Sequence, residues 1–205
     1  MKVQRIFTLM LVFFGLSTAT VVASSIWGNY EGFSIARLSI NDETQEFSDS
    51  DVPPLIVNGK TMLPLRSLTK SLEAMVKWDN TNKTVSIYKP NVHMIVASSI
   101  DNEFNITGPF SVVKKGGSHS FVILAQVDNL STSISSVRVS IESPSGQEVG
   151  TFVPDKKPSG SSFWLPALFN GVSFDEYGNY KVKFEMQLDD SSGYVVVSEK
   201  QILSN

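Results

Sequence analysis

The sequence contains no cysteine and only two histidines, His93 and His119. Without cysteine we expect no disulfide, no lipid attached to a cysteine and no thiol catalysis. The two histidines stand in no recognisable motif, and no acid, base and nucleophile can be assembled into a catalytic site. We therefore expect a protein that is not an enzyme, with no catalytic residue, no metal site and no cofactor.

Basic residues are fewer than acidic residues. The chain has 17 Lys and Arg against 20 Asp and Glu, a formal net charge of −3. Two of the basic residues, Lys2 and Arg5, lie at the N-terminus, so the part from residue 24 has 15 basic and 20 acidic groups, a net charge of −5. Nucleic-acid binding needs a basic surface that displaces counterions. We expect no nucleic-acid partner.

Long hydrophobic runs are absent apart from one at the N-terminus, which is uncharged from residue 6 to residue 25. A basic start, an apolar run and small residues near Val21-Val22-Ala23 are typical of a secretory signal peptide. We predict a signal peptide over residues 1–23 and a secreted or cell-wall associated protein of a Gram-positive bacterium, with no membrane partner after cleavage. The alternative is an uncleaved membrane anchor, because an apolar run of about 18 residues is close to the length that spans a bilayer.

Helical periodicity is confined to one stretch, residues 53–88. Within it, Asn58-Gly59 stands between two apolar runs, which predicts a two-residue hairpin turn. Pro64 cannot donate to a sheet but suits the first turn of a helix. The residues that follow have the spacing of one apolar helix face, which predicts a short amphipathic helix: Leu65, Leu68, Leu72 and Met75.

A second hairpin is predicted after this helix. Val76 and Trp78 alternate with Lys77, the segment 79–82 is rich in turn-forming residues, and alternation resumes over residues 85–87. We expect this hairpin to close the small domain with Trp78 on its inner face.

The segment VNGKTMLPLRSLTKSLEAMVKWDNTNKTVSI resembles the copper amine oxidase N-terminal-like domain, or stalk domain, of secreted proteins of Gram-positive bacteria. The resemblance rests on Gly59 in the hairpin, Pro64-Leu65-Arg66 at the helix start and Trp78-Asp79 before the last strand. It covers residues 32–88 and implies a small α+β domain over residues 24–89. It implies little about activity, because such domains accompany many partners, and two histidines cannot supply the three copper ligands of an amine oxidase.

We expect residues 90–205 to form a separate domain, because nearly every segment there is typical of a β-strand. The alternation is clearest from Tyr180 to Asp189, where five apolar residues on one face oppose five polar residues on the other. Seven or eight strands at this spacing predict an immunoglobulin-like β-sandwich. Tyr180, which opens this strand two residues after Gly178, has the position of a tyrosine corner, and we expect Tyr180 and Phe184 in the core. The fold class is thus mostly β, a small α+β module followed by a sandwich.

Two residues are candidates for binding. Arg66, at the predicted helix start, could contact a partner, although a local ion pair or hydrogen bond is the simpler role. Trp164 alternates with Phe163 and Leu165, so it is exposed if those two face the core and buried if they do not. The sequence leaves both orientations open.

Three classes of function remain. We favour a non-catalytic exported protein that acts as a structural or interaction module at the cell envelope, with a cell-wall polymer or another envelope protein as partner. The alternative is a carbohydrate- or peptidoglycan-binding protein that uses exposed aromatic residues such as Trp164. An enzyme such as a wall hydrolase would need a catalytic constellation that these residues do not offer.

Overall fold

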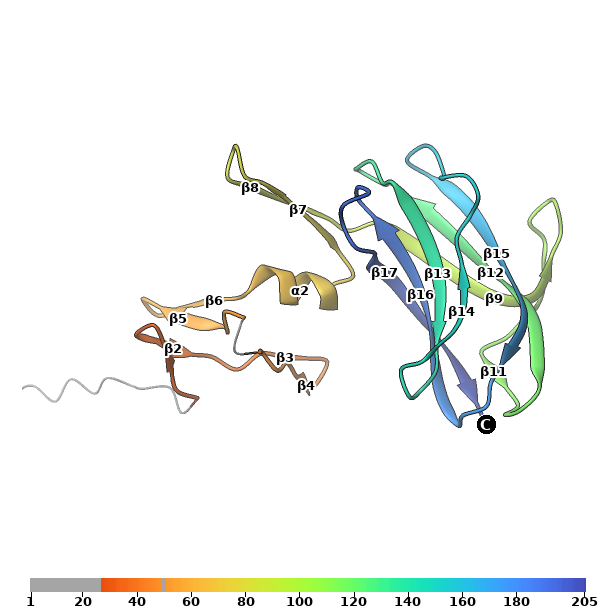
Figure 1. Cartoon of the computed structure of the whole chain (residues 1–205), viewed down its shortest axis with the longest axis horizontal. Helices are drawn as coiled ribbons and strands as arrows, with labels where there is room; N and C mark the ends of the chain where they lie inside the picture. Colours follow the sequence, from red (N-terminus) through yellow and green to blue (C-terminus); the bar gives the residue numbers. More distant parts are fainter. Residues whose placement is uncertain (1–26, 49–50) are drawn as a thin grey trace, which may run out of the picture. The chain divides into compact units, whose positions relative to one another are not determined.

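The computed structural model describes residues 27–48 and 51–205. These residues fall into two compact units, divided between Pro64 and Leu65 (Figure 1). The predicted signal peptide, residues 1–23, lies outside the described residues. The predicted domain boundary after residue 89 stays a prediction.

The first unit is built from short antiparallel strands. Asn58 and Gly59 both have positive φ angles, 50° and 73°, as a two-residue hairpin turn between paired strands requires, so the predicted turn is confirmed. Four strands form one sheet in the order β1-β2-β5-β6, and two form a separate hairpin: β1 (Asn29–Tyr30), β2 (Phe33–Ile35), β5 (Leu55–Val57) and β6 (Lys60–Met62), then β3 (Ser39–Ile40) and β4 (Glu43–Thr44).

Helix α2 (Leu65–Ser71) begins directly after Pro64, as predicted, but it is shorter than the apolar spacing indicated. Glu73 has a left-handed φ of 53°, and its N–H bonds the carbonyl of Lys70 while the next N–H bonds that of Thr69. This pair of bonds is a Schellman motif, which ends a helix. The predicted helical position of Met75 is therefore wrong, because Met75 is the buried first residue of strand β7.

Leu68 is half-buried in α2, whereas Leu72, just after the helix, is 48% exposed. The expected burial of Leu72 is therefore not observed, although its N–H still bonds the carbonyl of Leu68 as in a helix.

The second predicted hairpin is present as β7 (Met75–Asp79) and β8 (Thr84–Tyr88), which pair only with each other. Trp78 lies opposite Val85 and is 49% exposed, so its predicted inner-face position is wrong. Alternation distinguishes the two faces of a hairpin, but it does not tell which face another layer will cover.

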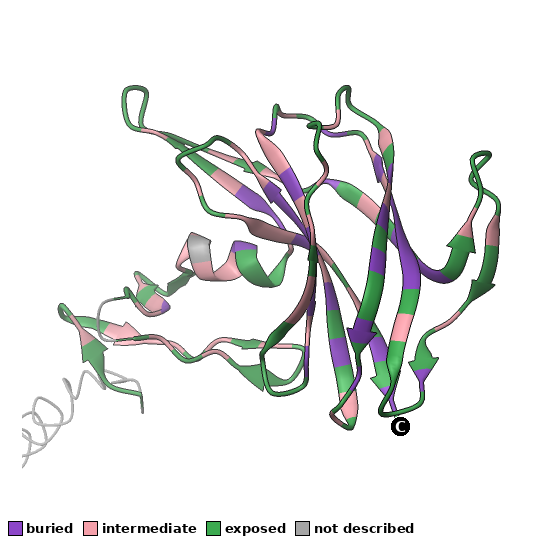
Figure 2. Cartoon of the chain, turned by 45° about the vertical axis from the view of Figure 1, so that its right-hand side comes forward, coloured by how far each residue is buried: buried purple, intermediate pink, exposed green. Residues whose placement is uncertain are grey.

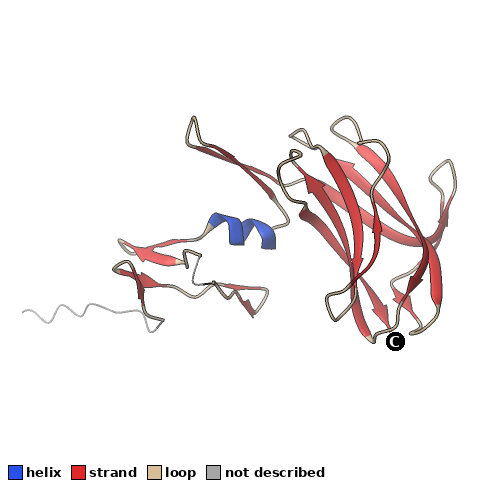
Figure 3. Ribbon diagram, in the orientation of Figure 1, coloured by secondary structure: helices blue, strands red, loops and turns tan. Residues whose placement is uncertain are grey.

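Residues 91–205 form two packed sheets, shown as facing layers of strands in Figures 1 and 3. The first sheet has the order β10-β9-β12-β15: β10 (Ile106–Pro109), β9 (Asn91–Ile100), β12 (Ser118–Asp128) and β15 (Phe163–Ser173). The second has the order β11-β17-β16-β13-β14: β11 (Val112–Val113), β17 (Val195–Ser204), β16 (Gly178–Gln187), β13 (Ser136–Glu142) and β14 (Glu148–Phe152). All pairs are antiparallel except β11 with β17. Within residues 27–48 and 51–205 the fold is mostly β with one short helix, in agreement with the predicted fold class.

The core lies between these two sheets, and buried residues concentrate in their strands (Figure 2). Tyr180 and Phe184 on β16 are 1% and 0% exposed, so both predicted core positions are confirmed. The Tyr180 hydroxyl accepts a hydrogen bond from the backbone N–H of Glu176, which is the contact that defines a tyrosine corner.

Candidate functional site

Trp164 lies on β15, an edge strand of the four-stranded sheet, and its side chain is 47% exposed. Its neighbour Leu165 is buried in the core, and Phe163 packs against the core. This settles the orientation that the sequence left open, because Trp164 must then point to the outer face of the sheet.

The outer face around Trp164 is apolar over three neighbouring strands. Val122 and Leu124 on β12 point away from the core cluster, yet each is only 3% exposed. Their cross-strand partners on β9 and β15 include Ile95 and Leu168, which are 39% and 61% exposed. An apolar outer face of this kind is unusual for an antiparallel sheet, whose outer face is commonly polar.

The hairpin that joins β9 to β10 brings a second aromatic ring to Trp164. Phe104 lies in this turn, and its ring centroid is 5.3 Å from that of Trp164 with an interplanar angle of 62°, an edge-to-face contact. The φ angle of Phe104 is 63°. A bulky residue with a left-handed backbone is an outlier that the surrounding structure must hold in place.

Asp101 holds this turn. Its carboxylate accepts hydrogen bonds of 2.9 Å from the backbone N–H groups of Glu103 and Asn105 and from the side-chain amide of Asn105, while its own carbonyl accepts the N–H of Phe104. The side-chain hydrogen bond from Asn105, aided by the two backbone bonds, lowers the pKa of Asp101 below its ordinary value. The carboxylate is therefore ionised at neutral pH, and its hydrogen bonds stabilise the turn.

A groove of about 460 Å³ lies between this turn and the sheet, a volume in the usual range of ligand sites. Val122, Pro166 and Leu168 belong to the sheet side of its lining, and Phe104 to the hairpin side. The polar side chains in the lining come from the hairpin and the strand ends: Ser98, Ser99, Asp101, Asn102, Ser120 and Asn170.

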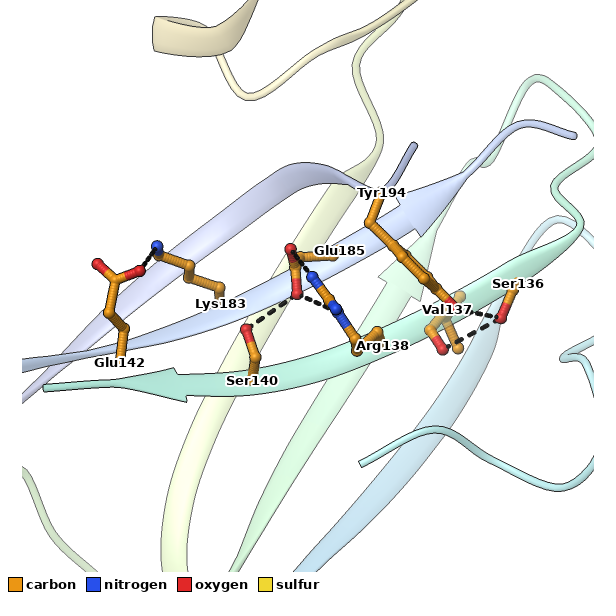
Figure 4. A network of polar contacts seen from close by, with 8 residues as sticks. All are labelled: Ser136, Val137, Arg138, Ser140, Glu142, Lys183, Glu185 and Tyr194. Atoms are coloured by element: carbon orange, nitrogen blue, oxygen red, sulfur yellow. Dashed lines mark hydrogen bonds and ion pairs between the residues drawn. The ribbon is translucent and has the colours of Figure 1, made fainter. Parts of the chain in front are cut away.

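A polar network on the five-stranded sheet is the other notable cluster of side chains (Figure 4). The Glu185 carboxylate, on a residue only 6% exposed, accepts two hydrogen bonds of 2.8 Å from Arg138 and one of 2.9 Å from Ser140. Arg138 also lies over the ring of Tyr194, 4.5 Å from its centroid, and the Tyr194 hydroxyl lies 2.9 Å from that of Ser136. The hydrogen bonds that Arg138 donates to Glu185 are the main cause of the raised pKa of Arg138. Because these groups satisfy one another, the network is suited to holding two strands together.

The other residues singled out from the sequence lie apart from the groove. Arg66 is in α2, but its side chain is outside what the structure describes. His93 is exposed on β9, and His119 lies edge-on to Phe174 at 5.5 Å. Among residues 27–48 and 51–205, no three His, Asp or Glu side chains are grouped so as to hold a metal ion. Over the same residues, no helix combines the length and apolar character needed to cross a membrane.

Sequence reasoning found Trp164 but missed Phe104, Leu168 and Asn170. A signal was present, because residues 121–125 and 165–169 are unbroken apolar runs and not alternating ones. Such runs indicate strands that are apolar on both faces. No local sequence pattern predicts the contact of Phe104 with Trp164, because the two residues are 60 positions apart in the chain and meet only in the folded structure.

Comparison with known proteins adds one finding. No curated protein matches the sequence. Residues 39–104 match the family model described as the copper amine oxidase N-terminal domain, which confirms the resemblance stated for residues 32–88 and extends through β9 to Phe104. The copper amine oxidase N-terminal domain is a non-catalytic, stalk-like domain, and residues 39–104 are similar to it.

Proposed function

We propose that this protein is a non-catalytic exported binding protein of the bacterial cell envelope, and that the outer face of the β10-β9-β12-β15 sheet is its binding surface. The observation that carries the proposal is the exposure of Trp164, at 47%, beside Phe104 and Leu168 on one apolar face. Exposed apolar patches on soluble domains mark sites of interaction, and aromatic side chains dominate the energetics of such sites.

Export is supported by the basic, apolar and small-residue pattern of residues 1–23. The similarity to a stalk-like domain supports a role as a spacer or interaction module. A non-catalytic domain in the same chain as a sandwich adds length and a surface for contacts, and it catalyses no reaction. The partner is a cell-wall polymer or another protein of the envelope. The residues of the Arg138 network are not part of the proposed surface, since their polar groups are already paired with one another.

The test is co-sedimentation of the chain from residue 24 with purified Gram-positive cell walls, using wild type, Trp164→Ala and Trp78→Ala. Trp78 is a matched control, because its side chain is 49% exposed but it belongs to the β7–β8 hairpin. The proposal predicts saturable binding that Trp164→Ala weakens and Trp78→Ala leaves unchanged. Equal loss in both variants, or binding that neither changes, would contradict it.

A further inference from the structure

The groove between the β9–β10 turn and β15 contains polar groups that the fold does not use. Asn102 and Asn170 line it, both are exposed, and neither side chain has a hydrogen-bond partner among the residues that the structure describes. Each amide offers two donors and an acceptor. They stand beside the apolar surface of Val122, Pro166 and Leu168. A ligand that fits must therefore combine an apolar side with neutral hydrogen-bonding groups.

The charge of the groove narrows the ligand class. Asp101 is the one ionisable side chain in the lining, and no Lys, Arg or His accompanies it. A fixed negative charge without a basic neighbour disfavours an anionic ligand. A cation gains little from this carboxylate, because both of its oxygens already accept hydrogen bonds from the turn. An uncharged ligand matches this groove best.

The backbone of β15 argues against an extended peptide. Peptides that bind along a sheet add a strand to a free edge and depend on its backbone N–H groups. β15 is an edge strand, but Pro166 in its middle has no N–H and interrupts such pairing. Recognition in this groove must therefore come from side chains and from the aromatic surface, which suits a ring-shaped ligand.

We infer, on the basis of the proposed function, that the groove lined by Phe104, Leu168, Asn102 and Asn170 binds an uncharged N-acetylhexosamine unit of a glycan. The apolar face of a pyranose ring packs on Phe104 and Leu168. The acetamido group, with one N–H donor and one carbonyl acceptor, complements an asparagine amide. Trp164 does not line the groove and acts as a positioning residue, holding Phe104 by the edge-to-face contact.

The test is isothermal titration of the mature chain, residues 24–205, with the tetramer of N-acetylglucosamine and, as control ligand, its de-N-acetylated cationic counterpart. We expect saturable binding of the acetylated tetramer alone. Loss of one neutral hydrogen bond costs about 0.5–1.5 kcal/mol, so Asn170→Ala weakens binding roughly 2- to 12-fold. Asn91→Ala is the matched control, because Asn91 is exposed at the opposite end of β9 from the turn, and it leaves binding unchanged.

A second variant separates binding from folding. Phe104→Asn removes the ring but suits the left-handed backbone at this position, so the melting temperature stays close to wild type while tetramer binding is lost. No saturable binding of the tetramer, together with Trp164-dependent sedimentation on walls, would overturn the glycan inference and leave the proposed function standing. Absence of wall binding as well would overturn both the glycan inference and the cell-wall polymer as partner, and would leave another envelope protein as the partner. Tetramer binding that Asn170→Ala and Phe104→Asn do not change would overturn the assignment of the groove.

Discussion

The hydroxyl of Tyr180 accepts a hydrogen bond of 2.9 Å from the backbone N–H of Glu176, four residues earlier in the chain. The Tyr180 ring is 1% exposed and lies 4.7 Å, centroid to centroid, from the ring of Phe174. The bond therefore fixes the corner at which the chain leaves β15 in one sheet and enters β16 in the other.

Tyr180→Phe tests this corner. The variant keeps the ring and its packing but leaves the Glu176 N–H without its partner, so the free energy of unfolding falls by about 1 kcal/mol. Urea denaturation of residues 24–205 measures the change. Tyr177→Phe is the control, since Tyr177 is 70% exposed and its substitution leaves stability within error. If the two variants are equally stable, the tyrosine corner does not contribute as described.

The core position of Phe184 makes a larger effect testable. Its side chain is fully buried between the sheets, so Phe184→Ala lowers the free energy of unfolding by about 3–5 kcal/mol. Leu168→Ala, at a side chain that is 61% exposed, costs less than about 0.5 kcal/mol by the same assay. A change of only a degree or two in the melting temperature of Phe184→Ala would refute the assignment of β16.

The pairing of Arg138 with Glu185 predicts non-additive behaviour. Arg138→Met leaves the buried Glu185 carboxylate with Ser140 as its side-chain partner, at a cost of about 2 kcal/mol. This is less than for a fully buried pair because the Arg138 side chain is itself 30% exposed. Adding Glu185→Leu removes the unpaired charge and restores most of the stability. A double variant as unstable as the sum of the two single variants would contradict this account.

The turn around Asp101 predicts a dependence on acid. Because its folded pKa is lowered, chiefly by the side-chain hydrogen bond from Asn105, its contribution to the turn is complete above the ordinary aspartate pKa of about 3.9. This contribution to stability is lost as the pH falls below that value and through the lowered pKa of Asp101 in the folded state. NMR titration of the Asp101 carboxyl carbon measures this pKa, and Asn105→Ala should raise it. An unchanged pKa in Asn105→Ala would show that the side-chain amide is not its cause.

How far the sequence predicts the fold depends on whether a residue's role is local. The ten-residue alternation that predicted β16 and the Asn58-Gly59 turn are local signals, and both predicted the observed structure. The end of α2 was missed because Glu73 adopts a left-handed backbone without being the glycine that usually marks such a position.

The candidate site was harder to predict for a related reason. The orientation of Trp164 follows from the core position of its neighbours, which alternation alone left ambiguous. Phe104 reaches Trp164 only because the Asp101 turn directs it there, and the groove exists only once both are in place. Trp78 shows the converse, since its alternation suggested burial but its hairpin pairs with no further strand.

The most direct test of the central claim is hydrogen exchange of residues 24–205, free and bound to cell walls, read out by peptide mass spectrometry. The account predicts slower exchange on binding in residues 101–105 and 163–170, which form the turn and the edge strand at the groove. It predicts no change in residues 136–142, the strand of the Arg138 network. Protection confined to residues 136–142, or to the β7–β8 hairpin, would contradict the claim that the outer face at Trp164 is the binding surface.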